Sequence, residues 1–245
     1  MSPHDVAIVV PMLDEAAALP RLLRHFAALD PRPAEIVAVD GGSRDASVAI
    51  AGASGLVTVL RCPTRGRAAQ INHGVGAVRS PLVCVLHADT LLPDDAVSVI
   101  RRTLEDPRLA LAGFTPLLSG PETVRWGTSL HNWLKTWYAP LLFRPHLFLR
   151  GGRLLFGDHA MFFRRVDFEA VGGCDESLAL MEDADLCLRL VRRGRIRLVN
   201  RVVITSDRRV AAWGPIKANW IYLKVGVRWG LGLRRGLERH YPDVR

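Results

Sequence analysis

Four short runs of mainly apolar residues, separated by segments with helical periodicity, constrain the fold of this chain more than any other feature. The runs are Val6–Val10, Glu35–Val39, Val57–Leu60 and Leu82–Leu86. Apolar runs of this length are typical of strands buried on both faces, as in parallel sheets. Strands that alternate with helices predict a mostly parallel sheet with right-handed crossovers. We therefore expect an α/β fold with a Rossmann-like sheet flanked by helices.

The pattern becomes less regular after Asp106-Pro107. Residues 109–114 are predicted to form a strand, and the aromatic stretch 126–149 a helix and a loop. Residues 157–165 return the chain to a strand, and a short helix is expected at 166–172. Beyond Trp213, Gly214-Pro215 opens one more helix.

The fourth apolar run stops at His87-Ala88-Asp89, and Pro93-Asp94-Asp95 marks the start of the next helix. Open α/β sheets bind ligands at the carboxyl ends of their strands. His87 and Asp89 stand two residues apart on an extended segment, so both side chains point the same way. Together they could hold a divalent cation, which could hold a diphosphate. Alternatively, Asp89 caps the following helix.

Two other polar clusters follow strands. Asp40 ends the second run, where it could hydrogen-bond a ribose or a base edge, and Gly41-Gly42 lets the backbone approach a ligand closely. Arg65 and Arg67 flank a glycine at a helix start, which suits a diphosphate. An ordinary strand-to-helix turn and a solvated pair of arginines are the alternatives. A Rossmann dehydrogenase is excluded, because no G-x-G-x-x-G follows the first strand.

A second carboxylate cluster, Glu182, Asp183 and Asp185, begins a helix. The helix dipole stabilises ionised carboxylates at this end. One of them could serve as a general base if it lies in a cleft beside a metal-bound diphosphate. Plain acidic residues of a helix N-terminus are the alternative.

The net charge of +9 and the pI of about 10.2 favour anionic partners, such as a nucleotide or an acidic membrane surface. We expect no nucleic-acid partner, because no helix-turn-helix, RNP or zinc pattern occurs. The four widely spaced cysteines fit a reducing compartment. No signal-peptide pattern and no stretch of about 18 uncharged apolar residues is present, so we expect a cytoplasmic protein without a spanning helix.

Taken together, these clusters resemble family-2 glycosyltransferases of the GT-A fold, and most of all the small bacterial branch associated with radical-SAM/selenodomain proteins. The resemblance covers roughly residues 6–210. Its specificity comes from the order of the matching segments, since no single one is diagnostic. The segments are Val9–Glu15, Val39–Asp45, Arg65–Asn72, Leu86–Thr90, Gly157–His159, Met181–Leu186 and Thr205–Arg209.

The resemblance implies an inverting, metal-dependent transferase that moves a sugar from a nucleotide-diphosphate sugar to an acceptor hydroxyl. Asp183 would be the base, and Glu182 belongs to the same catalytic segment. Asp40 would contact the nucleoside. The implied nucleotide site comprises Pro11, Glu15, Asp40, Gly41, Arg65, Arg67, Asn72, Ala88, Arg208 and Arg209.

Asp89 would be the metal-binding Asp of the family's Asp-x-Asp motif, with Mn²⁺ or Mg²⁺ as the cofactor. The first Asp of that motif is His87 here, which could alter metal affinity or preference. His159 is a candidate for completing the shell, with a structural role as the alternative. Arg208 and Arg209 lie where the family often closes a loop over the diphosphate.

We divide the chain into a GT-A domain at 1–210, with a nucleotide-sugar half at 1–106 and an acceptor half at 107–210, and a basic amphipathic tail at 211–245. One sector of the tail helix carries Lys217, Lys224, Arg228, Arg235 and Arg239. The tail could meet an anionic membrane at its inner face, near a lipid-linked acceptor, or pack on the domain, or mediate oligomerisation. A sugar nucleotidyltransferase and a non-catalytic nucleotide-binding module remain the alternative functions.

Overall fold

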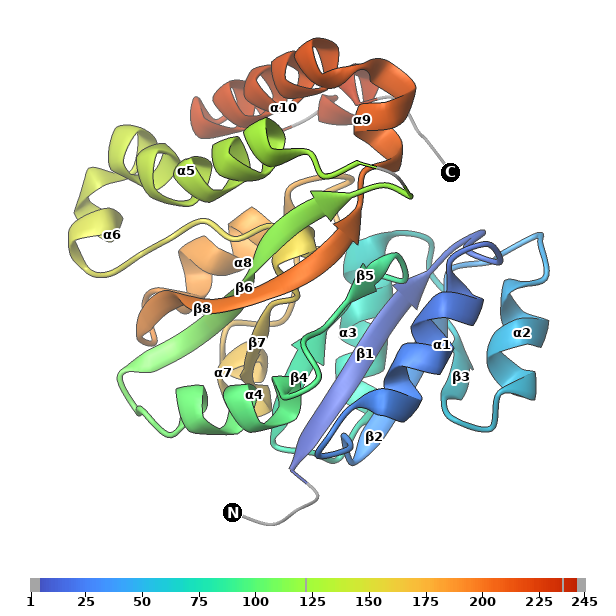
Figure 1. Cartoon of the computed structure of the whole chain (residues 1–245). Helices are drawn as coiled ribbons and strands as arrows, with labels where there is room; N and C mark the ends of the chain where they lie inside the picture. The colour runs from blue at the N-terminus through green and yellow to red at the C-terminus, as the bar shows by residue number, and fades with distance from the viewer. Residues whose placement is uncertain (1–4, 122, 235, 242–245) are drawn as a thin grey trace.

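The computed structural model describes residues 5–121, 123–234 and 236–241. Its centre is an eight-stranded sheet in the order β3-β2-β1-β4-β7-β6-β8-β5 (Figure 1). The strands are β1 (Val6–Met12), β2 (Glu35–Asp40), β3 (Thr58–Arg61), β4 (Leu82–Val85), β5 (Thr90–Leu91), β6 (Leu109–Ser119), β7 (Phe162–Arg164) and β8 (Arg195–Ser206).

The four predicted apolar runs form the parallel part of the sheet. β1 pairs in parallel with both β2 and β4, and β2 with β3. β7 is antiparallel to β4 and β6, and β8 returns parallel to β6. Pro11 lies inside β1, whereas we expected the strand to end before it. The register places Met12 beside Asp40, so the carboxyl ends of β1 and β2 meet at one edge.

Helices cover both faces of the sheet (Figure 1). Alternate residues of β1 point to opposite faces. Ile8 and Val10 pack with residues of the helices at 19–28 and 96–104, whereas Ala7 and Val9 pack with residues of the helices at 67–77 and 182–190. The helices are α1 (Leu19–Ala28), α2 (Ser47–Ala53), α3 (Arg67–Ala77), α4 (Ala96–Leu104), α5 (Trp126–Phe143), α6 (Pro145–Leu149), α7 (Arg165–Ala170), α8 (Glu182–Leu190), α9 (Arg208–Trp213) and α10 (Pro215–Gly230), with short 3₁₀ turns η1 (Gly157–His159) and η2 (Leu237–His240).

The C-terminal helix begins at Pro215, as predicted, but ends at Gly230 rather than continuing through Arg239. Arg239 lies in η2, and Arg235 lies outside the described residues. α10 packs beside α5 (Figure 1). In the part of the chain that the structure describes, no helix combines the length and the apolar character needed to cross a membrane.

Candidate active site

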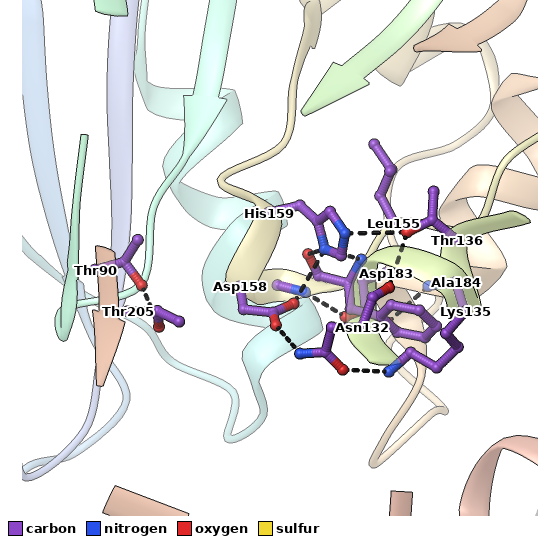
Figure 2. Close-up of polar contacts among 12 residues, drawn as sticks. Thr90, Asn132, Lys135, Thr136, Leu155, Asp158, His159, Asp183, Ala184 and Thr205 are labelled. Carbon is purple, nitrogen blue, oxygen red and sulfur yellow. Dashed lines mark hydrogen bonds and ion pairs between the residues drawn. The ribbon is translucent and has the colours of Figure 1, made fainter. Parts of the chain in front are cut away.

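Arg208 links two carboxylates from neighbouring strand ends. Its guanidinium donates to both oxygens of Glu15, at 2.8 and 2.7 Å, and lies 3.2 Å from Oδ2 of Asp89. Glu15 follows β1 and Asp89 follows β4. β8 leads into this position because it pairs with β5, where Thr205 Oγ1 lies 2.9 Å from Thr90 Oγ1 (Figure 2). Three residues that the sequence analysis selected therefore meet in one cluster.

Asp89 and His87 do not lie on an extended segment as expected, because the Thr90 amide donates to the His87 carbonyl at 3.1 Å and closes a turn over Ala88 and Asp89. Burial raises the pKa of Asp89, and the charge of Arg208 opposes this rise. Burial, together with the charges of Arg67 and Arg209, lowers the pKa of His87 to about 3, so its imidazole is neutral, the form that binds metals. Among the described residues, no group of three or more His, Cys, Asp or Glu side chains could hold a metal ion. A carboxylate suits Mg²⁺ or Mn²⁺, which can take its other ligands from water and substrate phosphates, so Asp89 fits such a cation better than the His87 imidazole does.

His159 is a structural residue, and the prediction that it completes the metal shell is wrong. Its side chain is fully buried. Its Nε2 lies 3.2 Å from Thr136 Oγ1, and its Nδ1 lies 3.1 Å from Asp158 Oδ1. Both ring nitrogens are therefore occupied within the protein.

Asp183 lies at the start of α8, with its carboxylate held by two backbone amides. Gly157 donates to Oδ2 and Ala184 to Oδ1, both at 2.7 Å (Figure 2). Burial and the negative charge of Glu182 raise the pKa of Asp183 to about 6, although Arg67 and the two amides oppose the rise. This carboxylate is ionised at neutral pH and is a stronger base than an exposed aspartate.

Glu182 forms an ion pair with Arg67 and is almost fully buried. Although burial acts in the other direction, the charges of Glu182 and Asp183 raise the pKa of Arg67 above its usual range. Oε2 of Glu182 is buried and has no hydrogen-bond donor among the described residues. Glu182 thus holds Arg67 with one oxygen, while its other oxygen is shielded from solvent.

Gly157 connects the His87 side of the site to Asp183. A methyl group on Gly157 would lie 2.2 Å from Cε1 of His87, so the imidazole packs directly on this backbone. The amide of the same residue donates to Asp183. The candidate metal-binding imidazole and the candidate base are therefore separated by a single glycine.

The sequence analysis did not identify a polar network on the inner face of α5. Asn132 donates to Oδ2 of Asp158 at 2.8 Å, and Lys135 donates to Oδ1 of Asn132 at 3.2 Å (Figure 2). Burial opposes the ionisation of Asp158, but His159 and Lys135 outweigh it and hold the pKa of Asp158 below its usual range. The available signal was Asn132, Lys135 and Thr136 at helical spacing within an otherwise apolar helix.

The C-terminal segment reaches the same region. The guanidinium of Arg209 lies 5.2 Å from the centroid of the Tyr241 ring, which also contacts Trp213 and Tyr222. Burial raises the pKa of Tyr241, whereas the charge of Arg209 opposes this rise. Arg209 therefore lies between the C-terminal aromatic residues and the Asp89 cluster.

The remaining candidates on the nucleotide side lie near the carboxyl ends of β1, β2 and β4. Asp40 accepts hydrogen bonds from the amides of Gly42 and Ser43, at 3.2 and 3.0 Å, so it also stabilises its own turn. Gly41 packs on the Gln70 side chain, which leaves no room for a Cβ atom. The other two, Pro11 and Ala88, are buried.

Two predicted nucleotide-binding residues are not brought into this cluster. Asn72 donates to the Cys174 carbonyl at 2.9 Å and to Glu176 at 2.8 Å, and it accepts from the Cys174 amide at 2.7 Å. Its amide group therefore fastens α3 to the loop at 173–176. Arg65 is exposed beside the start of α3.

Comparison with known proteins agrees with this architecture. The model of the family described as "Glycosyl transferase family 2" matches residues 7–172. The pre-mycofactocin glycosyltransferase of Mycobacterium tuberculosis is 29% identical over 216 residues, which cover 85% of this chain and 44% of that protein. The chain thus spans less than half the length of this relative.

Solved structures share the fold at low sequence identity. The mannosyltransferase PcManGT from Pyrobaculum calidifontis, in complex with GDP-Man and Mn²⁺, has a TM-score of 0.68 at 20% identity and covers 94% of this chain and 64% of that one. Glucosyl-3-phosphoglycerate synthase from M. tuberculosis, with Mn²⁺, UDP and glucosyl-3-phosphoglycerate, has a TM-score of 0.63 at 16% identity and covers 94% and 80%. These likenesses establish a GT-A type of fold.

Proposed function

The chain belongs to glycosyl transferase family 2, and on that premise we propose that it transfers a sugar from a nucleotide-diphosphate sugar to an acceptor hydroxyl, with inversion at the anomeric carbon. The nucleotide lies at the carboxyl ends of β1, β2 and β4, where Asp40 and Gly41 face the nucleoside. Glu15 and Arg208 lie on the diphosphate side of this site. A sugar nucleotidyltransferase and a non-catalytic module are less favoured by the family assignment.

Asp89 and His87 are the residues that would hold a divalent cation. When bound, it would neutralise the charge that develops on the departing diphosphate. Structural relatives that contain Mn²⁺ together with GDP-Man or UDP support this choice of cofactor. Arg208 and Arg209 add positive charge next to Asp89, since both guanidinium groups oppose the rise in the pKa of that carboxyl.

Asp183 acts as the general base. The acceptor oxygen attacks the anomeric carbon while the bond from that carbon to the diphosphate breaks, and the acceptor proton passes to Asp183. A single displacement of this kind inverts the configuration, and one carboxylate opposite the leaving group suffices. The raised pKa of about 6 suits a base that works near neutral pH. Glu182 keeps Arg67 in place through their ion pair.

The observation that carries this proposal is the position of Gly157. It contacts His87 and donates to Asp183, so the cation side and the base side lie one residue apart. A transferred sugar must be reached from both sides at once, and the two contacts of Gly157 support a site of this kind. Residues 1–106 would then supply the donor half and 107–210 the acceptor half, with α5 on the acceptor side.

The experiment follows the release of nucleoside diphosphate from UDP-, GDP- and dTDP-sugars in the presence of a bacterial lipid extract, which serves as a source of acceptors. Asp183→Asn should abolish release while nucleotide binding is retained, because the base is removed and the donor site is not. Asp175→Asn is the matched control, since Asp175 bonds to Ser177 in an exposed turn. Turnover by Asp183→Asn at the wild-type rate would refute the assignment of the base.

A further inference from the structure

α10 has two apolar faces, of which only one is buried. Its inner face is formed by Ala218, Ile221, Val225 and Trp229. The outer face carries five large apolar side chains at intervals of three and four positions, which places them along one stripe of a helix. Within α10, the most exposed of these apolar side chains are Ile216, at 88%, and Trp220, at 65%. The stripe consists of Ile216, Trp220, Leu223, Val227 and Leu231.

α5 repeats this arrangement. It buries Thr128, Ser129, Asn132, Thr136, Ala139 and Pro140 against the domain. Its outer stripe is apolar and exposed, with Trp126 and Leu142 both at 69% exposure; it comprises Trp126, Leu130, Trp133, Leu134, Leu141 and Leu142. An exposed apolar residue is ordinary when it stands alone, but contiguous apolar patches mark interaction sites.

The two stripes share one outer surface. α5 and α10 lie side by side (Figure 1). Asn219 of α10 contacts His131 and Thr128 of α5 at 2.9 and 3.2 Å, and Arg144 donates to the Gly230 carbonyl at the other end. Each of the two helices packs one face on the domain and one side against the other helix. The apolar stripes of α5 and α10 therefore both face outward. We call this surface, formed by the stripes of α5 and α10 together with Leu149 of α6, the apolar face.

The charges around the apolar face have one sign. Residues 126–157 and 208–237 contain no Asp or Glu. Lys217 and Lys224 are exposed on α10, next to its stripe. An amphipathic surface with large apolar side chains, tryptophans and lysines binds the boundary of an anionic bilayer, where the lysines meet lipid phosphates. A protein partner would not require this complete lack of acidic residues.

We propose that the apolar face docks the protein on an anionic membrane surface. Two helices supply it, α5 and α10. Docking would also orient the candidate site. On the inner face of α5, Lys135 donates to Asn132 and Asn132 donates to Asp158. The outer face of the same helix would meet the lipid, so about 10 Å, the diameter of one helix, would separate this network from the membrane. This orientation, which rests on the proposed function, favours an acceptor anchored in the same bilayer.

Co-sedimentation of the full chain with vesicles tests the docking without requiring catalysis. Vesicles of phosphatidylcholine alone are compared with mixtures of phosphatidylcholine and phosphatidylglycerol. We expect binding to the anionic vesicles, weaker binding to the neutral ones, and a decrease as salt is added. The double variants Trp126→Ser/Leu130→Ser on α5 and Ile216→Ser/Trp220→Ser on α10 should each lower partitioning by at least about tenfold, because large apolar side chains leave the lipid.

The control is Leu56→Ser/Val166→Ser, which removes two exposed apolar residues at other surfaces and should partition like the wild type. Circular dichroism verifies that each variant is folded. Protein that remains in the supernatant with both kinds of vesicle overturns the proposal. So does a dimer in light scattering that both double variants dissociate, since a second copy then covers the apolar face. Vesicle binding with no sugar transfer under any condition would leave the docking intact and count against the proposed function alone.

Discussion

Arg208 and Glu15 are 193 positions apart in the sequence and form a two-bond ion pair at the carboxyl edge of the sheet. The same guanidinium also contacts Asp89. This arginine therefore lies between two carboxylates, where its positive charge offsets their mutual repulsion. The pair therefore joins the first strand of the fold to the segment that follows its last strand, in the region where a diphosphate would bind.

Replacing Arg208 should weaken nucleotide binding. Arg208→Ala leaves Glu15 and Asp89 facing each other without the cation between them, so we expect at least about a tenfold loss in affinity for a nucleoside diphosphate. Arg208→Lys keeps the charge but cannot form two parallel bonds, so its affinity should be intermediate. Isothermal titration calorimetry measures both. Arg192→Ala, at a surface position outside the site, is the control, and an Arg208→Ala protein with wild-type affinity would contradict this role.

The rate of transfer should depend on the ionisation of Asp183. The base works only when deprotonated, and its pKa is raised to about 6. We therefore expect kcat to increase with pH, to reach half its maximum near pH 6, and to stay constant above about pH 7. A pH profile of nucleoside diphosphate release at saturating donor measures this. A profile already flat between pH 5 and 7 would show that another group is the base.

The same raised pKa should appear in the stability of the protein. A carboxyl whose pKa is higher in the folded state than in the unfolded state makes folding less favourable as pH increases, here between about pH 4 and 6. Asn at position 183 does not ionise, so the stability of Asp183→Asn relative to the wild type should increase over this window, by up to about 3 kcal/mol. Urea unfolding at a series of pH values gives this difference. A difference independent of pH would mean that Asp183 ionises normally.

Gly157 should tolerate no side chain. In Gly157→Ala the methyl group would collide with His87, so either the imidazole moves or the bond to Asp183 breaks. We expect a loss of transfer of at least about a hundredfold and a loss of unfolding free energy of about 1–3 kcal/mol. Gly127→Ala in α5 is the matched control: nothing lies within 4 Å of the added methyl group, and the change should stabilise the helix by roughly 0.5–1 kcal/mol. Equal activity of the two variants would count against the proposed link.

The sequence was sufficient to predict the parallel half of the sheet, because β1, β2 and β4 consist mainly of buried apolar residues and β3, although it is an edge strand, also contains a short apolar run. It also placed Asp40 and Asp89 at the correct edge, since both end such runs. β8 was missed because charged residues alternate through Arg195–Ser206 and half of the strand is exposed. The helix predicted through Arg239 was too long because Gly232 adopts a left-handed conformation with φ of 87°, and the amides of Gly232 and Leu233 donate back to the carbonyls of Trp229 and Arg228, which ends the helix.

The partners of the site residues could not be predicted. The ion pairs of Arg208 with Glu15 and of Arg67 with Glu182 join residues 193 and 115 positions apart, and only the folded sheet brings them together. Nor does spacing distinguish a buried structural histidine such as His159 from a metal ligand. The division of the chain into donor half, acceptor half and tail remains a prediction.

The most direct test of the proposed function is calorimetric titration of the wild type and of Asp89→Ala with UDP, GDP, dTDP and CDP, each with and without Mn²⁺. The account predicts that one nucleotide binds tightly, that binding requires Mn²⁺, and that Asp89→Ala abolishes the metal-dependent part. Absence of binding by all four nucleotides in the presence of Mn²⁺, or equal binding by Asp89→Ala, would contradict it.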